Sequence, residues 1–266
     1  FMQAFLIINN QSSGPIYGTF AGLPEASTVG AGLYGFRISY VGGDGNDVTL
    51  RGNHSPVVFW VGNTDGDGDG TSWNDPFNWS SDVQPGTNDD VVIDSGFNVT
   101  HSAAVADTVR SIESHGQLTI SDGTLAVTAE SIFAGSLILS GGTLSTSAHL
   151  QIGNLVWTSG TLQGVGSPTA TVTGTVGALG NIDLRNITLD LTQATLAAGS
   201  NHLTSLRLDD ATLLRAETWT VAGPFLWMGG KLDAGSGAGS LIANGGMTIT
   251  GGSVHNFVHN VAVTNA

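Results

Sequence analysis

The apolar positions of the chain follow a repeated phrase between Gly116 and Val254. Each phrase has two apolar residues separated by a variable one, then a Gly-containing or small polar turn, then one more apolar residue. The phrases end at Leu125, Leu144, Leu162, Leu179, Leu196, Leu213, Leu232 and Val254, which gives steps of 19, 18, 17, 17, 17, 19 and 22 residues. Steps this regular indicate a repeat architecture.

The two earlier apolar positions of each phrase form columns of their own. Seven places before the closing residues stand Leu118, Leu137, Leu155, Val172, Leu189, Leu206, Phe225 and Met247. Five places before them stand Ile120, Leu139, Trp157, Gly174, Leu191, Leu208, Trp227 and Ile249. Alternating apolar and variable positions are typical of a strand that shows one face to a core. The register therefore places Trp157 and Trp227 in that core, while Trp219 falls outside the columns and is expected to be exposed.

One phrase cannot fold alone. Its three inward side chains contribute roughly 1.5–3 kcal/mol each when buried, whereas ordering the backbone costs about 1–2 kcal/mol per residue. Stacking closes this gap, because each coil then gains ladder hydrogen bonds above and below. We therefore predict an all-β fold, a right-handed parallel β-helix (β-solenoid) with coils of about 17–19 residues.

Composition agrees with this fold and narrows the possible partners. The chain has 266 residues, 39 Gly, no Cys and only 11% charged residues, which is typical of an all-β protein with many turns. Its formal net charge is −14, so a nucleic-acid partner is not expected, because no basic stripe is present to meet phosphates. No apolar run has the length of a membrane span, so membrane insertion is not expected in this segment.

Residues 1–50 precede the repeats and predict several short strands. Their successive phrases are Ile-Ile-Asn-Asn, Gly-Thr-Phe-Ala-Gly-Leu-Pro-Glu, Phe-Arg-Ile-Ser-Tyr and Gly-Gly-Asp-Gly-Asn-Asp-Val-Thr-Leu. In this order, over Ile7 to Leu50, they resemble the closing segment of autotransporter-associated β-strand repeat modules. The resemblance implies a β-solenoid or its cap, displayed on or secreted from a bacterial cell, and it implies no enzymatic activity.

Four segments follow from these patterns. Residues 1–50 are the end of a preceding β-repeat module or a small β cap, and residues 51–57 are a linker. Residues 58–115 are an acidic, Trp-containing junction with the first irregular coils. Similar openings precede Gly-Thr-Leu-rich repeats in giant bacterial surface proteins. Residues 116–266 are the solenoid repeats, which we expect to be truncated at the C-terminus.

The junction contains the strongest candidate for a metal site. Asp65, Asp67 and Asp69, followed by Gly70, match the first half of a calcium loop, in which alternate carboxylates converge on one cation. The twelfth loop position is Pro76 where a Glu belongs, so Asp75 is the substitute ligand. The sequence thus predicts a possible calcium cofactor held by Asp65, Asp67, Asp69 and Asp75. The alternative is a solvated Asp/Gly loop that binds no metal.

Aromatic residues surround the same loop. Trp73 and Trp79, with Trp60 and Phe77 nearby, are candidates to stack on a sugar ring. The alternative is that these rings plug the open end of the solenoid, where unpaired edge strands need cover.

Catalysis is not expected. A lyase or glycosidase on this fold needs carboxylates, usually with a basic residue, on one face. The repeats offer Asp183, Asp190, Asp209, Asp210, Glu217 and Asp233, together with Arg185, Arg207, Arg215 and Lys231. Asp190 and Arg207 hold equivalent places in adjacent phrases, so they are expected to pair.

The hypothesis from sequence is a non-catalytic stalk, adhesin or matrix element of a large bacterial extracellular or cell-surface protein. Its expected partner is a cell-surface or matrix polysaccharide, or neighbouring copies of itself. The alternatives are a carbohydrate-binding module and a β-helix polysaccharide lyase or hydrolase.

Overall fold

The computed structural model describes residues 4–25, 27–31, 34–43, 45–52, 57–197, 202–215, 217–250 and 256–266. The chain forms two compact units, Phe1–Pro56 and Val57–Ala266. The boundary falls within the predicted linker, and the junction and the repeats belong to one unit. The described part of the chain contains no helix with the length and apolar character of a membrane span.

The first unit is a small antiparallel sheet with the strand order β1-β4-β3-β2. Its strands are β1 (Ala4–Ile8), β2 (Thr28–Ala31), β3 (Tyr34–Gly42) and β4 (Asp47–Gly52). Ile38, Tyr40 and Val48 form its core. The Tyr40 hydroxyl donates to the Leu23 carbonyl and accepts from the Phe20 N–H, so it holds the connection that follows β1 against the sheet.

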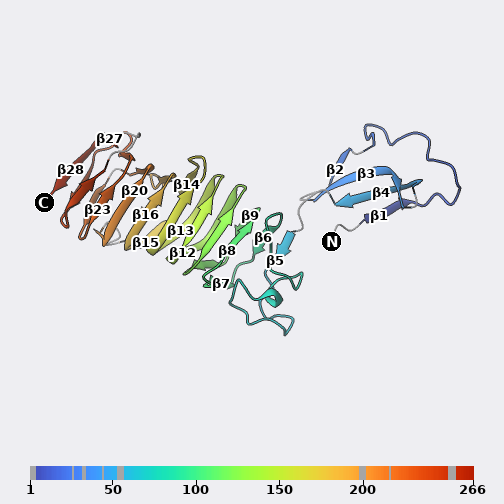
Figure 1. Ribbon diagram of the computed structural model, residues 1–266, viewed down its shortest axis with the longest axis horizontal. Coiled ribbons are helices and arrows are strands. Elements are labelled where there is room, and N and C mark those ends of the chain that lie inside the picture. The colour runs from blue at the N-terminus through green and yellow to red at the C-terminus, as the bar shows by residue number, and fades with distance from the viewer. Residues whose placement is uncertain are drawn as a thin grey trace. The chain divides into compact units, whose positions relative to one another are not determined.

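The second unit is a parallel β-helix of about nine turns, as the pattern predicts. Each turn passes through three faces in a fixed order, and the parallel strands of successive turns stack (Figure 1). Two strands, β12 (Ser131–Thr146) and β13 (Leu150–Gly164), run through all three faces of their turns. Pairing in register continues from β12 to β13 over this whole length, so the stack is tightest here.

The remaining strands divide among the faces. Face 1 contains β5 (Val57–Phe59), β6 (Asp90–Ile93), β9 (Ser111–Ser114), β14 (Thr169–Val172), β17 (Thr188–Asp190), β21 (Ala211–Leu214), β24 (Gly230–Asp233) and β27 (Asn256–His259). Face 2 contains β7 (Asn98–His101), β10 (Gln117–Ile120), β15 (Thr175–Leu179), β18 (Thr195–Leu196), β19 (His202–Leu203), β22 (Thr218–Val221), β25 (Gly239–Ala243) and β28 (Val261–Asn265). Face 3 contains β8 (Ala106–Val109), β11 (Thr124–Val127), β16 (Asn181–Arg185), β20 (Ser205–Asp209), β23 (Phe225–Trp227) and β26 (Met247–Ile249).

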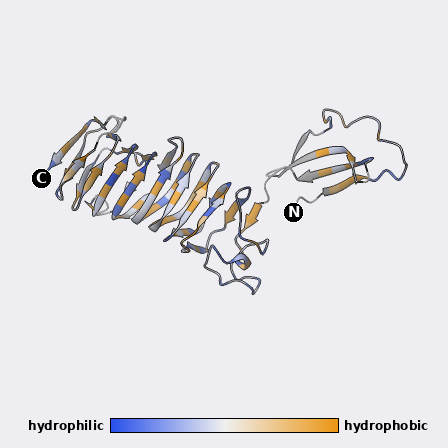
Figure 2. Ribbon diagram, viewed as in Figure 1, coloured by the Kyte–Doolittle hydropathy of each residue, from blue (hydrophilic) through white to orange (hydrophobic). Residues whose placement is uncertain are grey.

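Inward side chains of successive turns stack into ladders that fill the interior. On face 3 one ladder is formed by Leu125, Leu144, Leu162, Leu184, Leu208 and Trp227, and each of these is at most 2% exposed. Hydrophobic and hydrophilic positions alternate along the strands of the stack (Figure 2). Trp157 and Trp227 are buried as predicted, but Trp219 is also buried, because it lies inward on β22, opposite Leu241.

The turns register differently from the predicted columns after Leu162. The structure pairs Leu162 with Leu184, and it pairs the predicted partner, Leu179, with Trp157 on face 2. The steps along face 3 after Leu162 are 22 residues to Leu184 and 24 to Leu208, not 17. The predicted period slipped because all three faces carry the same alternation, so an apolar pair on one face resembles a pair on the next.

Glycines allow close stacking at the corner between faces 1 and 2. Gly116, Gly135, Gly153 and Gly174 occupy this corner in four successive turns. A Cβ added at Gly135 would lie 2.0 Å from the Gly116 carbonyl oxygen, and one at Gly153 would lie 2.5 Å from that of Ala134. The next turn approaches so closely that no side chain fits between the two backbones.

The segment before β6 covers the N-terminal end of the β-helix. Ser72 forms a parallel bridge with Thr100 of β7, and the Trp73 N–H donates to the Thr100 carbonyl. A short 3-10 helix, η1 (Pro76–Asn78), begins after Asp75, whose side chain accepts from the Phe77 N–H. This segment, residues 60–79, is called the cap below; it supplies a partner for the first strand of face 2.

Candidate functional site

The cap holds the predicted calcium ligands, but two of the four carboxylates are engaged by the loop itself. Asp69 Oδ1 accepts from the N–H groups of Thr71 and Ser72 and from the Asn78 amide, at 2.7–2.8 Å. The hydrogen bonds from Ser72, Asn78 and Thr71, in that order of strength, lower the pKa of Asp69. Asp75 accepts from the N–H groups of Phe77 and Asp69, at 3.1 and 2.9 Å.

This geometry does not assemble the predicted calcium site. Asp65 and Asp67 are exposed, whereas Asp69 and Asp75 point their oxygens at backbone N–H groups. Within the described ranges, no three or more His, Asp or Glu side chains form a group that could hold a metal ion. The carboxylates instead serve as turn-forming acceptors, which is a common role of Asp beside glycine.

The tryptophans of the cap lie in the core and not on a binding surface. Trp73 and Trp79 are both 0% exposed, so the expectation that they stack on a sugar ring is not met. Trp79 packs edge-on against Trp60 and Trp73, with ring centroids 4.8 Å apart in both pairs. Its indole N–H donates to the Trp73 carbonyl. The rings plug the end of the β-helix, as the alternative interpretation held.

A buried histidine connects the cap to the first turn. His101 is 0% exposed and stands in register with Ile120, where the interior is otherwise apolar. Its Nδ1 lies 2.9 Å from the Asp122 carbonyl oxygen and its Nε2 lies 2.9 Å from Asp107 Oδ2. The Asn74 amide of the cap donates to the same Asp107 oxygen, at 2.7 Å. This chain of hydrogen bonds satisfies polar groups that would otherwise be costly to bury.

The basic side chains of the β-helix all lie in ion pairs. Within single strands, Arg185 pairs with Asp183, Arg207 with Asp209 and Lys231 with Asp233. Across a corner, Arg215 pairs with Glu217, and between strands Arg110 pairs with Asp90. The cluster therefore offers no unpaired cation to an anionic substrate.

The predicted pair of Asp190 and Arg207 does not form. Asp190 lies on face 1 beside Leu214, and its carboxylate accepts from Thr192. Arg207 lies on face 3 opposite Asp183, at 3.5 Å. The error follows from the slipped register described above.

Asp233 is the most strongly perturbed carboxyl group outside the cap. Burial acts to raise its pKa, but hydrogen bonds from Lys231, His259 and the Gly235 N–H outweigh burial and hold the pKa well below its usual range. His259 Nδ1 and the Gly235 nitrogen lie 2.8 and 2.7 Å from Oδ1. An ionised carboxylate held in this way stabilises the turn and is not suited to donate a proton.

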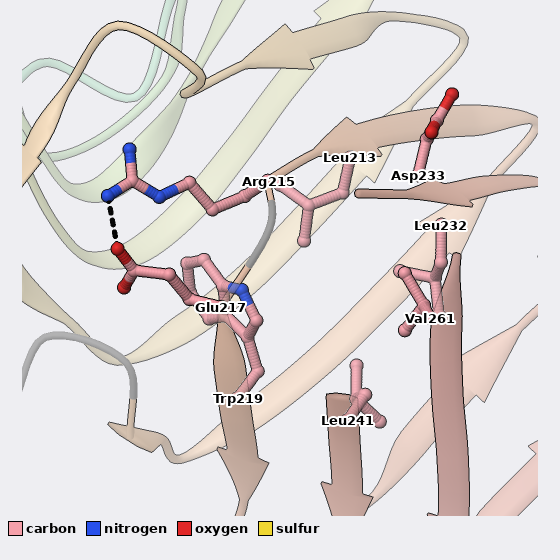
Figure 3. A pocket seen from close by; sticks show the side chains of 8 residues that line it. All are labelled: Leu213, Arg215, Glu217, Trp219, Leu232, Asp233, Leu241 and Val261. Carbon is pink, nitrogen blue, oxygen red and sulfur yellow. Dashed lines mark hydrogen bonds and ion pairs between the residues drawn. The ribbon is translucent and has the colours of Figure 1, made fainter. Parts of the chain in front are cut away.

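A small gap lies near Asp233 in the interior. Figure 3 shows it between Leu213, Leu232, Leu241 and Val261, with the paired Arg215 and Glu217 at one side. The space is hardly large enough for one water molecule and its lining is mostly apolar. It is a packing imperfection and not a ligand site.

The surface of face 3 carries a larger, polar groove. The groove has a volume of about 600 Å³ and crosses four successive strands, β12, β13, β16 and β20. Its lining consists of Gly141, Ser159, Gly160, Thr161, Asn181, Ile182, Asp183, Ser205 and Arg207. We call it the face 3 groove. Sequence reasoning missed it, because the residues come together only with the actual steps of 22 and 24 residues.

The groove combines engaged and free polar groups. The Ser205 hydroxyl donates to Asn181 Oδ1 at 3.0 Å, and the Thr161 hydroxyl donates to Asp183 Oδ2 at 3.4 Å. Within the described part of the protein, the Ser159 hydroxyl and the Asn181 amide nitrogen have no hydrogen-bond partner. Asp183 is already held by Arg185, at 2.6 and 3.0 Å. The arrangement suits hydrogen bonding to a polar ligand better than acid–base chemistry.

Comparison with known proteins adds no relative. No family model, no curated protein and no solved structure matches the chain. Arguments about function therefore rest on the geometry and on the residues themselves.

Proposed function

We propose that this chain is a non-catalytic structural and adhesive segment of a large bacterial extracellular or cell-surface protein. The observation that carries the proposal is the continuous apolar stack from β6 to β25, sealed at its N-terminal end by the tryptophans of the cap. Such a stack gives a stiff element, because each turn is held by ladders on both sides. The outward charges are paired among themselves, which leaves a surface suited to display.

Two features of the sequence support the extracellular assignment. The absence of Cys and the single Lys fit a surface protein that is held by ladders and not by disulfides. The resemblance of Ile7 to Leu50 to autotransporter-associated modules points to the same location. Calcium is left out of the proposal, because Asp69 and Asp75 already serve as acceptors within the cap.

A polysaccharide is the partner best supported. The face 3 groove offers free hydroxyl and amide groups, whereas a lyase or hydrolase would need unpaired catalytic carboxylates beside it. Association with neighbouring copies of the chain is the second candidate, because solenoid ends are templates for strand addition.

The test is a panel of insoluble polysaccharides, incubated with the full chain and scored for retained protein and for newly released chain ends. We expect retention on at least one neutral polymer and no release of ends above the protein-free control. Release of new ends would overturn the non-catalytic assignment. Absence of both effects would leave the structural role and remove the adhesive one.

A further inference from the structure

We propose that the face 3 groove binds a short stretch of a neutral, linear glycan. This inference rests on the proposed function and names the ligand class of its adhesive surface. The groove lies away from the cap, so it is distinct from the residues that the sequence suggested for metal or sugar binding. Its walls come from four consecutive turns, and no residue from the first unit is among its lining.

The lining presents the groups that recognise sugar hydroxyls. Ser159 and Thr161 supply hydroxyls, and Asn181 supplies an amide nitrogen that no described group uses as a donor. Hydroxyl, amide and carboxylate groups in a concave site fix the orientation of a polar ligand. Gly141 and Gly160 are also in the lining and keep that corner free of side chains.

The repeat of the β-helix suits a repeating ligand. Neighbouring strands lie about 4.8 Å apart, so the groove spans roughly 14 Å over its four strands. Polar residues recur along this direction in register, with Thr161 beside Asp183, Asp183 beside Arg207, and Asn181 beside Ser205. A chain of a few sugar rings laid along the axis would meet a hydrogen-bonding group at each turn.

The charges of the groove favour a neutral glycan over an acidic one. Arg207 already pairs with Asp209 and lies 3.5 Å from Asp183, so it has little free positive charge to offer a uronate or sulfate. The net charge of −14 opposes the approach of a polyanion. The lining contains no aromatic ring, so binding relies on hydrogen bonds and is expected to be weak.

The experiment is an NMR titration of the ¹⁵N-labelled full chain. The probes are cellohexaose, xylohexaose, mannohexaose and maltohexaose, with hexagalacturonate as the acidic comparison. We expect at least one neutral hexasaccharide to shift amide signals of β13, β16 and β20 in a saturable way. Hexagalacturonate should cause no comparable shift.

Matched variants locate the site. Asn181→Ala removes a single amide and should weaken binding roughly fivefold, the usual effect of one lost hydrogen bond. Ser159→Trp fills the groove and should abolish binding. Gln151 is exposed on face 1, so Gln151→Ala and Gln151→Trp should bind as the wild type does. Circular dichroism and thermal unfolding confirm that each variant folds.

The outcomes separate this inference from the proposed function. Absence of shifts with all four neutral probes, binding that survives both groove variants, or tighter binding of hexagalacturonate would each overturn the inference. Cleavage of a probe would overturn the non-catalytic assignment but not the location of the groove. Binding that both groove variants reduce, while both Gln151 variants retain it, is the result we expect.

Discussion

Asp183 and Arg207 lie directly opposite one another on adjacent turns of face 3, with Arg207 Nε 3.5 Å from Asp183 Oδ1. Their same-strand partners occupy the reverse order, since Asp183 precedes Arg185 and Arg207 precedes Asp209. Each charge therefore faces the opposite sign both along its strand and across to the next one. A shift of register by two residues would place like charges opposite one another, which is destabilising.

The coupling between Asp183 and Arg207 is measurable. The variants Asp183→Ala, Arg207→Ala and the double variant, unfolded in urea, should give a coupling energy of about 0.5–1 kcal/mol, the size for a partly exposed pair. The control is the same cycle with Asp190 in place of Asp183, for which we expect no coupling. Equal coupling in both cycles would contradict the register of face 3.

Gly135 should tolerate no larger side chain. Its added methyl group would lie 2.0 Å from the Gly116 carbonyl oxygen and 2.6 Å from that of His115. Backbone atoms cannot move aside without disturbing the ladder, so Gly135→Ala should lower the free energy of unfolding by about 2 kcal/mol or more. Gly86→Ala is the control, because its nearest neighbour would be 3.8 Å away. Thermal unfolding compares the two, and equal stability would show that the corner is looser than the structure indicates.

Asp107 should stabilise the cap through His101. Asp107→Ala leaves the buried Nε2 of His101 without its partner and removes the acceptor of the Asn74 amide. The expected cost is about 1–3 kcal/mol, and hydrogen exchange should quicken in residues 71–79 before it does in β12 and β13. In the control, Asp122→Ala, the lost side chain accepts only from its neighbour Gly123. A similar effect of both substitutions would argue against this connection.

Asp233 should contribute to stability in a pH-dependent way. Its pKa is lower in the folded protein than in the unfolded chain. The stabilisation is therefore fully present above the unfolded value, about 3.9, and it is lost as the pH falls below that value towards the folded pKa. Asp233→Asn should lower stability at pH 7 and flatten the loss on acidification.

The measurement for Asp233 is the urea midpoint between pH 7 and pH 2.5. Asp94→Asn is the matched control, because Asp94 is exposed and its carboxylate makes no hydrogen bond within the described residues. If both variants follow the wild-type profile, Asp233 does not supply the acid-sensitive part of the stability.

Calcium should not stabilise the cap. Because Asp69 and Asp75 already accept hydrogen bonds from the loop, added calcium or a chelator should change the Tm by less than about 1 °C. Asp69→Ala should lower the Tm in either condition, since it removes the acceptor for Thr71, Ser72 and Asn78. A rise in Tm with calcium that Asp69→Ala abolishes would restore the metal interpretation.

Part of the fold was predictable from the spacing of apolar residues. The columns of Leu118, Leu137 and Leu155 and of Leu125, Leu144 and Leu162 are confirmed as stacked ladders. Each of these steps is 18 or 19 residues, so the turns carry no insertion. Beyond Leu162 the turns grow by loop residues, and a repeated apolar pair does not reveal on which of three faces it lies.

The sites were less predictable than the fold, for the same reason. The spacing of Asp65, Asp67 and Asp69 fits a metal loop in one dimension, but Asn78 and the backbone N–H groups that engage Asp69 lie further along the chain. Trp219 was expected to be exposed because its column depends on the slipped period. The face 3 groove requires the correct length of two consecutive turns, which composition and local pattern do not contain.

The corner glycines and the in-register ladders make each turn an interchangeable unit. A turn contacts its two neighbours and carries the same alternation on every face, so a whole turn can be duplicated or lost without changing what the others touch. Each such event would alter the reach of the segment by one strand spacing, about 4.8 Å. Copy number can thus act as a ruler, which sets how far a host protein holds its outer parts from the surface it stands on.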